Sequence, residues 1–204
     1  MLHLWVILAT SYGELYGQTK ANSGEAFINE IFNKVADSTL SRYYLLSTSV
    51  PCSFKRFDFD EWMKYGLKEK VPFEILNELA KNAFLDKTTS QWDQSKLLKA
   101  ICIPGDQAKA ILSCCPAPGD GHPPAWQPGK KALLSQKKAW EEKPREERMV
   151  FCFSKPAFTA DSRYAVIDVA FRCDDKACGM GSTYIFRREG QEWIIAGEMI
   201  AWAN

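Results

Sequence analysis

The sequence predicts an α+β domain in which N-terminal helices pack on a C-terminal antiparallel β-meander of about four strands. Three observations carry this prediction: helical apolar periodicity in residues 18–103, a proline- and glycine-rich and charged connection in 104–148, and strand-like segments in 149–204. The chain has 204 residues, 46% of them hydrophobic, which is enough to bury a core. We therefore expect residues 18–204 to form one domain.

Two N-terminal segments have the spacing of amphipathic helices. Asn22 is followed three residues later by Glu25, the pattern of a capping box, and Pro72 suits the first turn of a second helix. The apolar positions that share a helical face are Phe27, Ile28, Ile31, Phe32 and Val35 in the first helix, and Phe73, Leu76, Leu79, Ala80 and Ala83 in the second. We interpret both stripes as packing surfaces rather than ligand sites.

The segments around these helices are less regular. Residues 40–50 contain an apolar run that fits either a strand or a helix, and we interpret it as helix followed by coil. Residues 54–65 carry five aromatic residues between basic ones, a combination that also occurs where proteins bind single-stranded nucleic acid. Because Asp58, Asp60 and Glu61 cancel the basic charge, we expect a short helix anchored by its aromatic residues.

The C-terminal part reads as strands. Along residues 164–172, Ala165 and Ile167 point to one face while Val166 and Asp168 point to the other, which predicts a strand with one buried face. Pro156 ends an earlier strand because proline donates no hydrogen bond to a β-ladder. The four predicted strands are residues 149–154, 164–172, 182–188 and 191–202.

The N-terminus predicts export. Residues 1–10 form an apolar run of signal-peptide length that is too short to span a bilayer, and small residues precede a plausible cleavage after Gly17. No Lys or Arg occurs before Lys20, so either the basic leader of a signal peptide is missing or the chain starts slightly before Met1. We expect residues 1–17 to be a signal peptide, the mature protein to be periplasmic, surface-located or secreted, and the mature chain to have no integral membrane segment. The alternative is that residues 4–8 are a buried segment of a cytosolic protein.

Seven cysteines fit an oxidising compartment. Cys173 and Cys178 flank the turn between two predicted strands, so a disulfide bond joins them if those strands form a hairpin. The alternative, half of a metal site, lacks two further ligands at a usual spacing. We expect Cys152 to be the unpaired, buried thiol. The remaining candidates for disulfide bonds are Cys52, Cys102, Cys114 and Cys115.

Composition and motifs exclude several kinds of function. With 26 basic and 25 acidic residues, the chain has no charge excess that indicates a nucleic-acid partner. It lacks a nucleotide-binding loop, a metalloprotease helix, a nucleophile elbow and a paired zinc signature. Its two histidines, His3 and His122, argue against a histidine triad or a multi-histidine metal site. We expect no cofactor and no metal ion.

Two constellations remain as candidate sites. Asp168 and Glu198 each interrupt an apolar strand, and two carboxylates on one side of a sheet perform general acid and base catalysis in many hydrolases. The alternative is that they form structural ion pairs with Arg172 and Arg187. Trp126, which lies between prolines, is a candidate contact for a sugar ring or peptide, or else it pins its loop to the domain.

The C-terminal third also carries a resemblance, in residues 153–158, 164–167, 178–181 and 192–195. Their pattern resembles one of uncharacterised exported bacterial proteins, in which a proline-marked strand leads into a sheet whose last strand carries a tryptophan. The helix-first, sheet-last order is also similar to the cone-shaped NTF2-like architecture. Neither resemblance implies an activity.

We therefore expect an exported, disulfide-stabilised protein that binds a small-molecule, glycan or protein ligand without catalysis. The alternatives are a hydrolase that uses Asp168 and Glu198, and a cytosolic, thiol-rich metal-binding protein.

Overall fold

The computed structural model describes residues 23–36, 40–55, 59–112, 138, 140–144, 148–173 and 179–203. Its helices are α2 (Gly24–Val35), α3 (Phe59–Glu61), the π-helical turn η2 (Trp62–Gly66), α4 (Phe73–Leu85), the 3-10 turn η3 (Gln94–Lys96) and α5 (Gly105–Ile111). Its strands are β1 (Tyr43–Leu46), β2 (Ala100–Ile103), β3 (Met149–Phe153), β4 (Ala157–Phe158), β5 (Tyr164–Cys173), β6 (Gly179–Glu189) and β7 (Glu192–Ala203). The predicted α+β class is confirmed.

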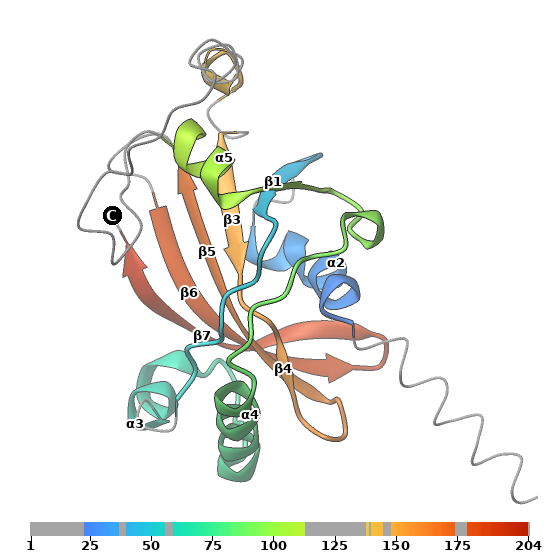
Figure 1. Ribbon diagram of the computed structural model, residues 1–204. Helices are drawn as coiled ribbons and strands as arrows, with labels where there is room; N and C mark the ends of the chain where they lie inside the picture. The colour runs from blue at the N-terminus through green and yellow to red at the C-terminus, as the bar shows by residue number, and fades with distance from the viewer. Residues whose placement is uncertain are drawn as a thin grey trace, which may run out of the picture.

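The strands of the described residues form one seven-stranded mixed sheet in the order β2-β1-β3-β5-β6-β7, with β4 beside β5 (Figure 1). β3, β5, β6 and β7 pair antiparallel, whereas β1 pairs parallel with both β2 and β3. The prediction of about four antiparallel strands is therefore wrong in two respects. The described sheet has seven strands, and β1 pairs parallel with both of its neighbours. Residues 18–103 are also not wholly helical, because β1 and β2 build one edge of the sheet and β1 replaces the helix expected in residues 40–50.

The two long helices form where the apolar stripes predict them. α2 buries Phe27, Ile28, Ile31 and Phe32, and α4 begins directly after Pro72 and buries Leu76, Leu79, Ala80 and Ala83. The N-cap of α2 is Ser23 rather than Asn22, since the Ser23 hydroxyl accepts a hydrogen bond from Ala26 N at 3.2 Å. Both stripes are packing surfaces, as expected, except that Phe73 at the start of α4 is 45% exposed.

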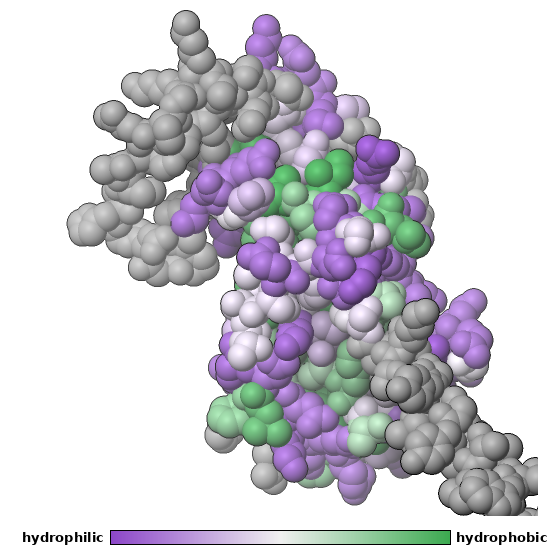
Figure 2. Space-filling model, turned by 45° about the vertical axis from the view of Figure 1, so that its right-hand side comes forward, coloured by the Kyte–Doolittle hydropathy of each residue, from purple (hydrophilic) through white to green (hydrophobic). Residues whose placement is uncertain are grey.

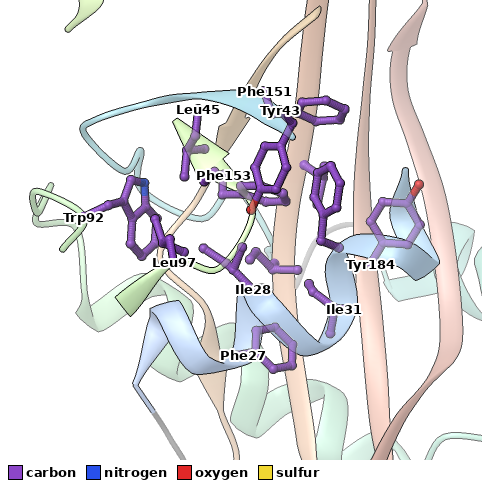
Figure 3. Close-up of a cluster of buried hydrophobic side chains, with 14 of the residues drawn as sticks. Phe27, Ile28, Ile31, Tyr43, Leu45, Trp92, Leu97, Phe151, Phe153 and Tyr184 are labelled. Atoms are coloured by element: carbon purple, nitrogen blue, oxygen red, sulfur yellow. The ribbon is translucent and has the colours of Figure 1, made fainter. Parts of the chain in front are cut away.

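α2 covers one face of the sheet with an aromatic cluster (Figure 3). Phe27 packs edge-on against Phe186 and Trp193, with ring centroids 5.5 and 5.0 Å apart, and Phe32 stacks on Tyr43 at 3.6 Å. In Figure 3 the side chains of Phe27, Ile28 and Ile31 point from α2 towards the strands. We call this face the α2 face.

The opposite face of the sheet, the α4 face, is also covered. Near one end of the sheet, side chains of α3, η2 and α4 pack on Val166 of β5 and Ile185 of β6. Near the other end, α5 and the buried Trp140 pack on Val150 of β3. Figure 1 shows α5 near the top of the view and α3 and α4 at the bottom. The expectation that residues 164–172 bury one face only is wrong, because this second layer covers the face of Val166 as well.

The layer of α5 and Trp140 also changes the interpretation of residues 104–148 as a connection. Trp140 is 2% exposed and lies edge-on to Tyr44 of β1 at 4.9 Å, so part of this stretch belongs to the core. Among the residues that the structure describes, no helix is both long enough and apolar enough to cross a membrane.

Candidate functional site

Asp168 lies on β5, on the α4 face and between its two apolar clusters. Its Oδ1 accepts a hydrogen bond from Thr183 Oγ1 at 2.6 Å, and its Oδ2 accepts one from the backbone N of Ser53 at 2.6 Å. Its own backbone N donates to Ser154 Oγ at 2.8 Å. The carboxylate therefore fastens the segment after β1 to the middle of the sheet, with one hydrogen bond to each oxygen.

Two free cysteines lie near this carboxylate on the same face. Burial raises the pKa of the Cys52 thiol to about 12, and the charge of Asp168 adds to the shift. Burial likewise raises the pKa of Cys152 to about 11, again with Asp168 as the next cause. Because the thiolate is the reactive form of cysteine, both side chains are inert at neutral pH.

Glu198 does not join Asp168. Asp168 is the cross-strand partner of Thr183, and Thr183 is in turn the partner of Met199, which packs against the α4 cluster. Glu198 instead pairs with Tyr184, which belongs to the aromatic cluster under α2. Since consecutive residues of a strand point to opposite faces, the two carboxylates lie on opposite faces of the sheet.

On the α2 face, Glu198 has partners of its own. Its Oε2 forms an ion pair with Lys68 Nζ at 3.2 Å, and its carboxylate is hydrogen-bonded to the hydroxyl of Tyr184. Burial, followed by the interactions with Glu198, raises the pKa of Tyr184 to about 12. In Figure 3 this hydroxyl points away from the aromatic cluster. The tyrosine is thus a neutral hydrogen-bond donor to the carboxylate at physiological pH.

Arg172 and Arg187 were the alternative ion-pair partners considered for Asp168 and Glu198, and the structure places them in different surroundings. Arg187 makes a bidentate contact with Glu69, with Nε and Nη2 at 2.6 and 3.1 Å from its two carboxylate oxygens. It also lies 3.9 Å from Glu189, and it therefore pairs with residues other than the two candidate carboxylates. Arg172 is on the same face as Asp168 and its charge lowers the pKa of Cys152.

The cysteines divide into two groups. Cys52, Cys102 and Cys152 carry free thiols, so the disulfide bonds considered for Cys52 and Cys102 are absent. Cys152 is unpaired as expected, but it is half-buried rather than buried. These two cysteines lie apart, with Cys52 in the cluster under α4 and Cys102 packed against the α2 face. Cys173, buried at the end of β5, is disulfide-bonded. Cys114, Cys115 and Cys178 lie outside the described residues, as does Trp126.

No group of three or more His, Cys, Asp or Glu side chains within the described residues is arranged to hold a metal ion. Sequence reasoning did not single out Ser53, Thr183 and Lys68 as partners of the two carboxylates. Alternation places Thr183 on one face of its strand, but its pairing with Asp168 depends on a register that no single strand encodes.

Exposed apolar side chains are concentrated on η2 and α4. Of the large apolar residues that the described part exposes most, these two helices carry Met63, Tyr65, Phe73, Phe84 and Leu85. On the face seen in Figure 2, apolar residues form separate patches between polar ones. The most exposed neighbours among them are Phe84 and Leu85, at 68% and 69%.

Comparisons with protein-family models, with curated proteins and with solved structures find no match. The function therefore has to be inferred from the chemistry of the chain itself.

Proposed function

We propose that the chain is an exported, disulfide-stabilised protein whose role is non-catalytic binding of a small-molecule, glycan or protein ligand. The observation that supports this proposal is the separation of Asp168 and Glu198 onto opposite faces of the sheet. A pair of carboxylates that catalyses hydrolysis must flank one bond of one substrate. The geometry thus gives the hydrolase alternative no support.

The surroundings of Asp168, Cys52 and Cys152 also support a non-catalytic role. Both oxygens of Asp168 already accept short hydrogen bonds, and the thiols of Cys52 and Cys152 stay protonated. A general base has to reach the proton that it abstracts, whereas these hydrogen bonds hold Asp168 against its own chain, and a nucleophilic cysteine needs a lowered pKa. These side chains instead stabilise the fold that presents a binding surface.

Export and the Cys173–Cys178 disulfide belong to the same proposal. The apolar run of residues 1–10 and the high cysteine content support export, and the disulfide-bonded state of Cys173 is compatible with an oxidising compartment. We infer Cys178 as its partner because the two residues flank the connection from β5 to β6, which pair antiparallel. The resemblances to uncharacterised exported bacterial proteins and to the NTF2-like architecture remain part of this proposal.

Catalysis is tested with chromogenic ester, phosphoester and glycoside substrates. We expect the wild-type chain to show no more turnover than a preparation of the double variant Asp168→Asn/Glu198→Gln. A hydrolytic activity of the wild-type chain that either single substitution abolishes, with the far-UV circular dichroism unchanged, would overturn the proposal.

Compartment and cross-linking are tested by expressing the full chain in a bacterium, fractionating the cells and sequencing the mature N-terminus. Alkylation under denaturing conditions should then label Cys52, Cys102 and Cys152 without reduction. A peptide that links Cys173 to Cys178 should appear in the mass spectrum until reductant is added. Seven alkylated cysteines without reduction, in a chain that keeps Met1, would support the cytosolic thiol-rich alternative instead.

A further inference from the structure

The C-terminal end of α4 combines exposed apolar side chains with lysines. Phe84 and Leu85 are its last two residues, and each is about two-thirds exposed. Lys87 Nζ lies 5.2 Å from the centroid of the Phe84 ring, a cation–π distance. Lys81 precedes Phe84 by three residues and Leu85 by four, so these exposed side chains share one side of the helix. We call Lys81, Phe84, Leu85 and Lys87 the α4 tip.

The carboxylates near the α4 tip are engaged elsewhere. Asp86 pairs with Lys155 at 2.6 Å, and this hydrogen bond holds the pKa of the Asp86 carboxyl below its ordinary value. Glu78, about one turn before Lys81, accepts a hydrogen bond from the backbone N of Ala160 at 2.6 Å. Within the part of the chain that the structure describes, no carboxylate forms an ion pair with Lys81 or Lys87. Among the described residues, the tip therefore presents two lysines without an ion-pair partner beside two apolar side chains.

We propose that the α4 tip docks on an anionic lipid surface. Phe84 and Leu85 enter the boundary between headgroups and acyl chains, while the ammonium groups of Lys81 and Lys87 contact the lipid phosphates. Long lysine side chains reach headgroups while their methylene stems stay in apolar surroundings. Apolar side chains flanked by lysines are the combination with which amphipathic helices bind anionic membranes.

Exposure and charge favour a lipid surface for the tip. Phe84 and Leu85 are adjacent and each about two-thirds exposed, so both can enter a headgroup layer, which needs no preformed pocket to receive them. The charge is complementary to anionic lipids, for which each lysine near the surface contributes roughly 1 kcal/mol of attraction.

This proposal goes beyond the ligand-binding role proposed above. The two proposals can fail separately. Binding to vesicles without binding to a soluble ligand would support only lipid docking, and the reverse result would support only the ligand-binding role.

The test is co-sedimentation of the mature chain with vesicles of phosphatidylcholine, with and without phosphatidylglycerol. We expect binding only to the anionic vesicles, with a marked loss at high salt. Lys81→Gln/Lys87→Gln should weaken it roughly 30-fold, from about 1 kcal/mol for each lysine. Phe84→Ser/Leu85→Ser should weaken it at least about tenfold, since each apolar side chain contributes more than that factor when fully buried.

Leu98→Ser is the matched control, because Leu98 is 84% exposed and lies outside α4. It should bind vesicles like the wild type. All variants change exposed side chains, and far-UV circular dichroism verifies that they fold. No binding to anionic vesicles, or equal binding by the wild type and both tip variants, would overturn the proposal. If a tip variant instead loses binding to a purified protein while vesicles never bind, the occupant is a protein and the lipid proposal is wrong.

Discussion

The side-chain amide of Gln94 lies at the outer edge of β2 and is hydrogen-bonded to the backbone of Cys102. It takes the place that a peptide group of a neighbouring strand would have. Gln94 Oε1 accepts from Cys102 N at 2.6 Å, and Nε2 donates to Ala100 O at 2.6 Å. Lys99 O and Ile103 O face β1, so Ala100 and Cys102 are the residues whose backbone groups face outward. One glutamine thus takes up two outward-facing backbone groups of β2, Cys102 N and Ala100 O, and hinders pairing of this edge with another chain.

Gln94→Ala should lower the free energy of unfolding by about 1 to 2 kcal/mol, because two hydrogen bonds are replaced by contacts with water. It should also produce concentration-dependent association, since an open edge strand is a template for β-pairing. Urea unfolding and sedimentation equilibrium measure the two effects. Gln91→Ala is the control, because it removes one exposed side-chain bond to Thr48 and should cost less than about 0.5 kcal/mol. A monomeric Gln94→Ala chain as stable as this control would contradict the blocking role.

The close approach of η2 to β7 favours glycine at position 197. A Cβ atom there would lie 3.0 Å from each of three atoms, Gly66 O, Leu67 Cδ2 and Trp62 Cζ3. Leu67 forms a bridge with Gly197, so the backbone cannot retreat without losing this pairing. Gly197→Ala should therefore lower the free energy of unfolding by about 1 to 3 kcal/mol, measured by thermal or urea unfolding.

Gly105→Ala provides the comparison for Gly197→Ala. A Cβ at Gly105, the first residue of α5, would meet no heavy atom within 4 Å. Alanine also favours the helix and restricts the unfolded chain, so this substitution should be neutral or stabilise by up to about 1 kcal/mol. Equal effects of the two substitutions would show that the contact with η2 is loose.

Long periodic segments of the sequence were predictable, and short apolar ones were not. α2 and α4 repeat their apolar residues over three turns, which only a helix explains. β1 and β2 are four residues each, YYLL and AICI, and so short a run fits a strand or a buried helix equally well. β1 also pairs with β3, which lies far along the chain. Local pattern carries no signal for such a contact.

The candidate site failed for a related reason. Asp168 does share a face with Val166, and Glu198 one with Ile200, as alternation predicts. Whether those two faces coincide depends on the register of β5 against β6 and on that of β6 against β7. The pairing of β6 with β7 also contains two irregularities. A shift of one residue exchanges the faces, and nothing within either strand fixes that shift.

The buried thiols predict how stability depends on alkaline pH. Below pH 9.0, the ordinary pKa of a thiol, Cys52 is protonated in both the folded and unfolded states. Above it the unfolded chain loses the proton, whereas burial keeps the folded thiol protonated up to its pKa of about 12. Loss of the proton therefore stabilises the unfolded state and not the folded one. The free energy of unfolding should fall by up to about 1.4 kcal/mol for each pH unit between these values.

Urea unfolding between about pH 8 and 10 measures this slope, and Cys52→Ala should make it shallower by the contribution of one thiol. Cys102→Ala is the control, because Cys102 is only half-buried and should change the slope less. A slope that is the same in the wild type and in Cys52→Ala would mean that the Cys52 thiol ionises as readily in the folded chain as in the unfolded one.

Substitutions of Asp168 distinguish a fastening role from a catalytic one. In Asp168→Asn, the amide oxygen still accepts from Ser53 N, and the amide nitrogen can donate to Thr183 Oγ1 because a hydroxyl also accepts. The free energy of unfolding should therefore fall by only about 1 kcal/mol, the difference between charged and neutral acceptors. In Asp168→Ala, the buried Thr183 hydroxyl and Ser53 N both lose their partner, and the free energy of unfolding should fall by about 2 to 3 kcal/mol.

Glu198→Ala, which breaks a partly exposed ion pair with Lys68, should cost less than Asp168→Ala in the same urea titration. If Asp168→Ala were no less stable than Glu198→Ala, the hydrogen bonds of Asp168 would not hold the segment at Ser53 to the sheet.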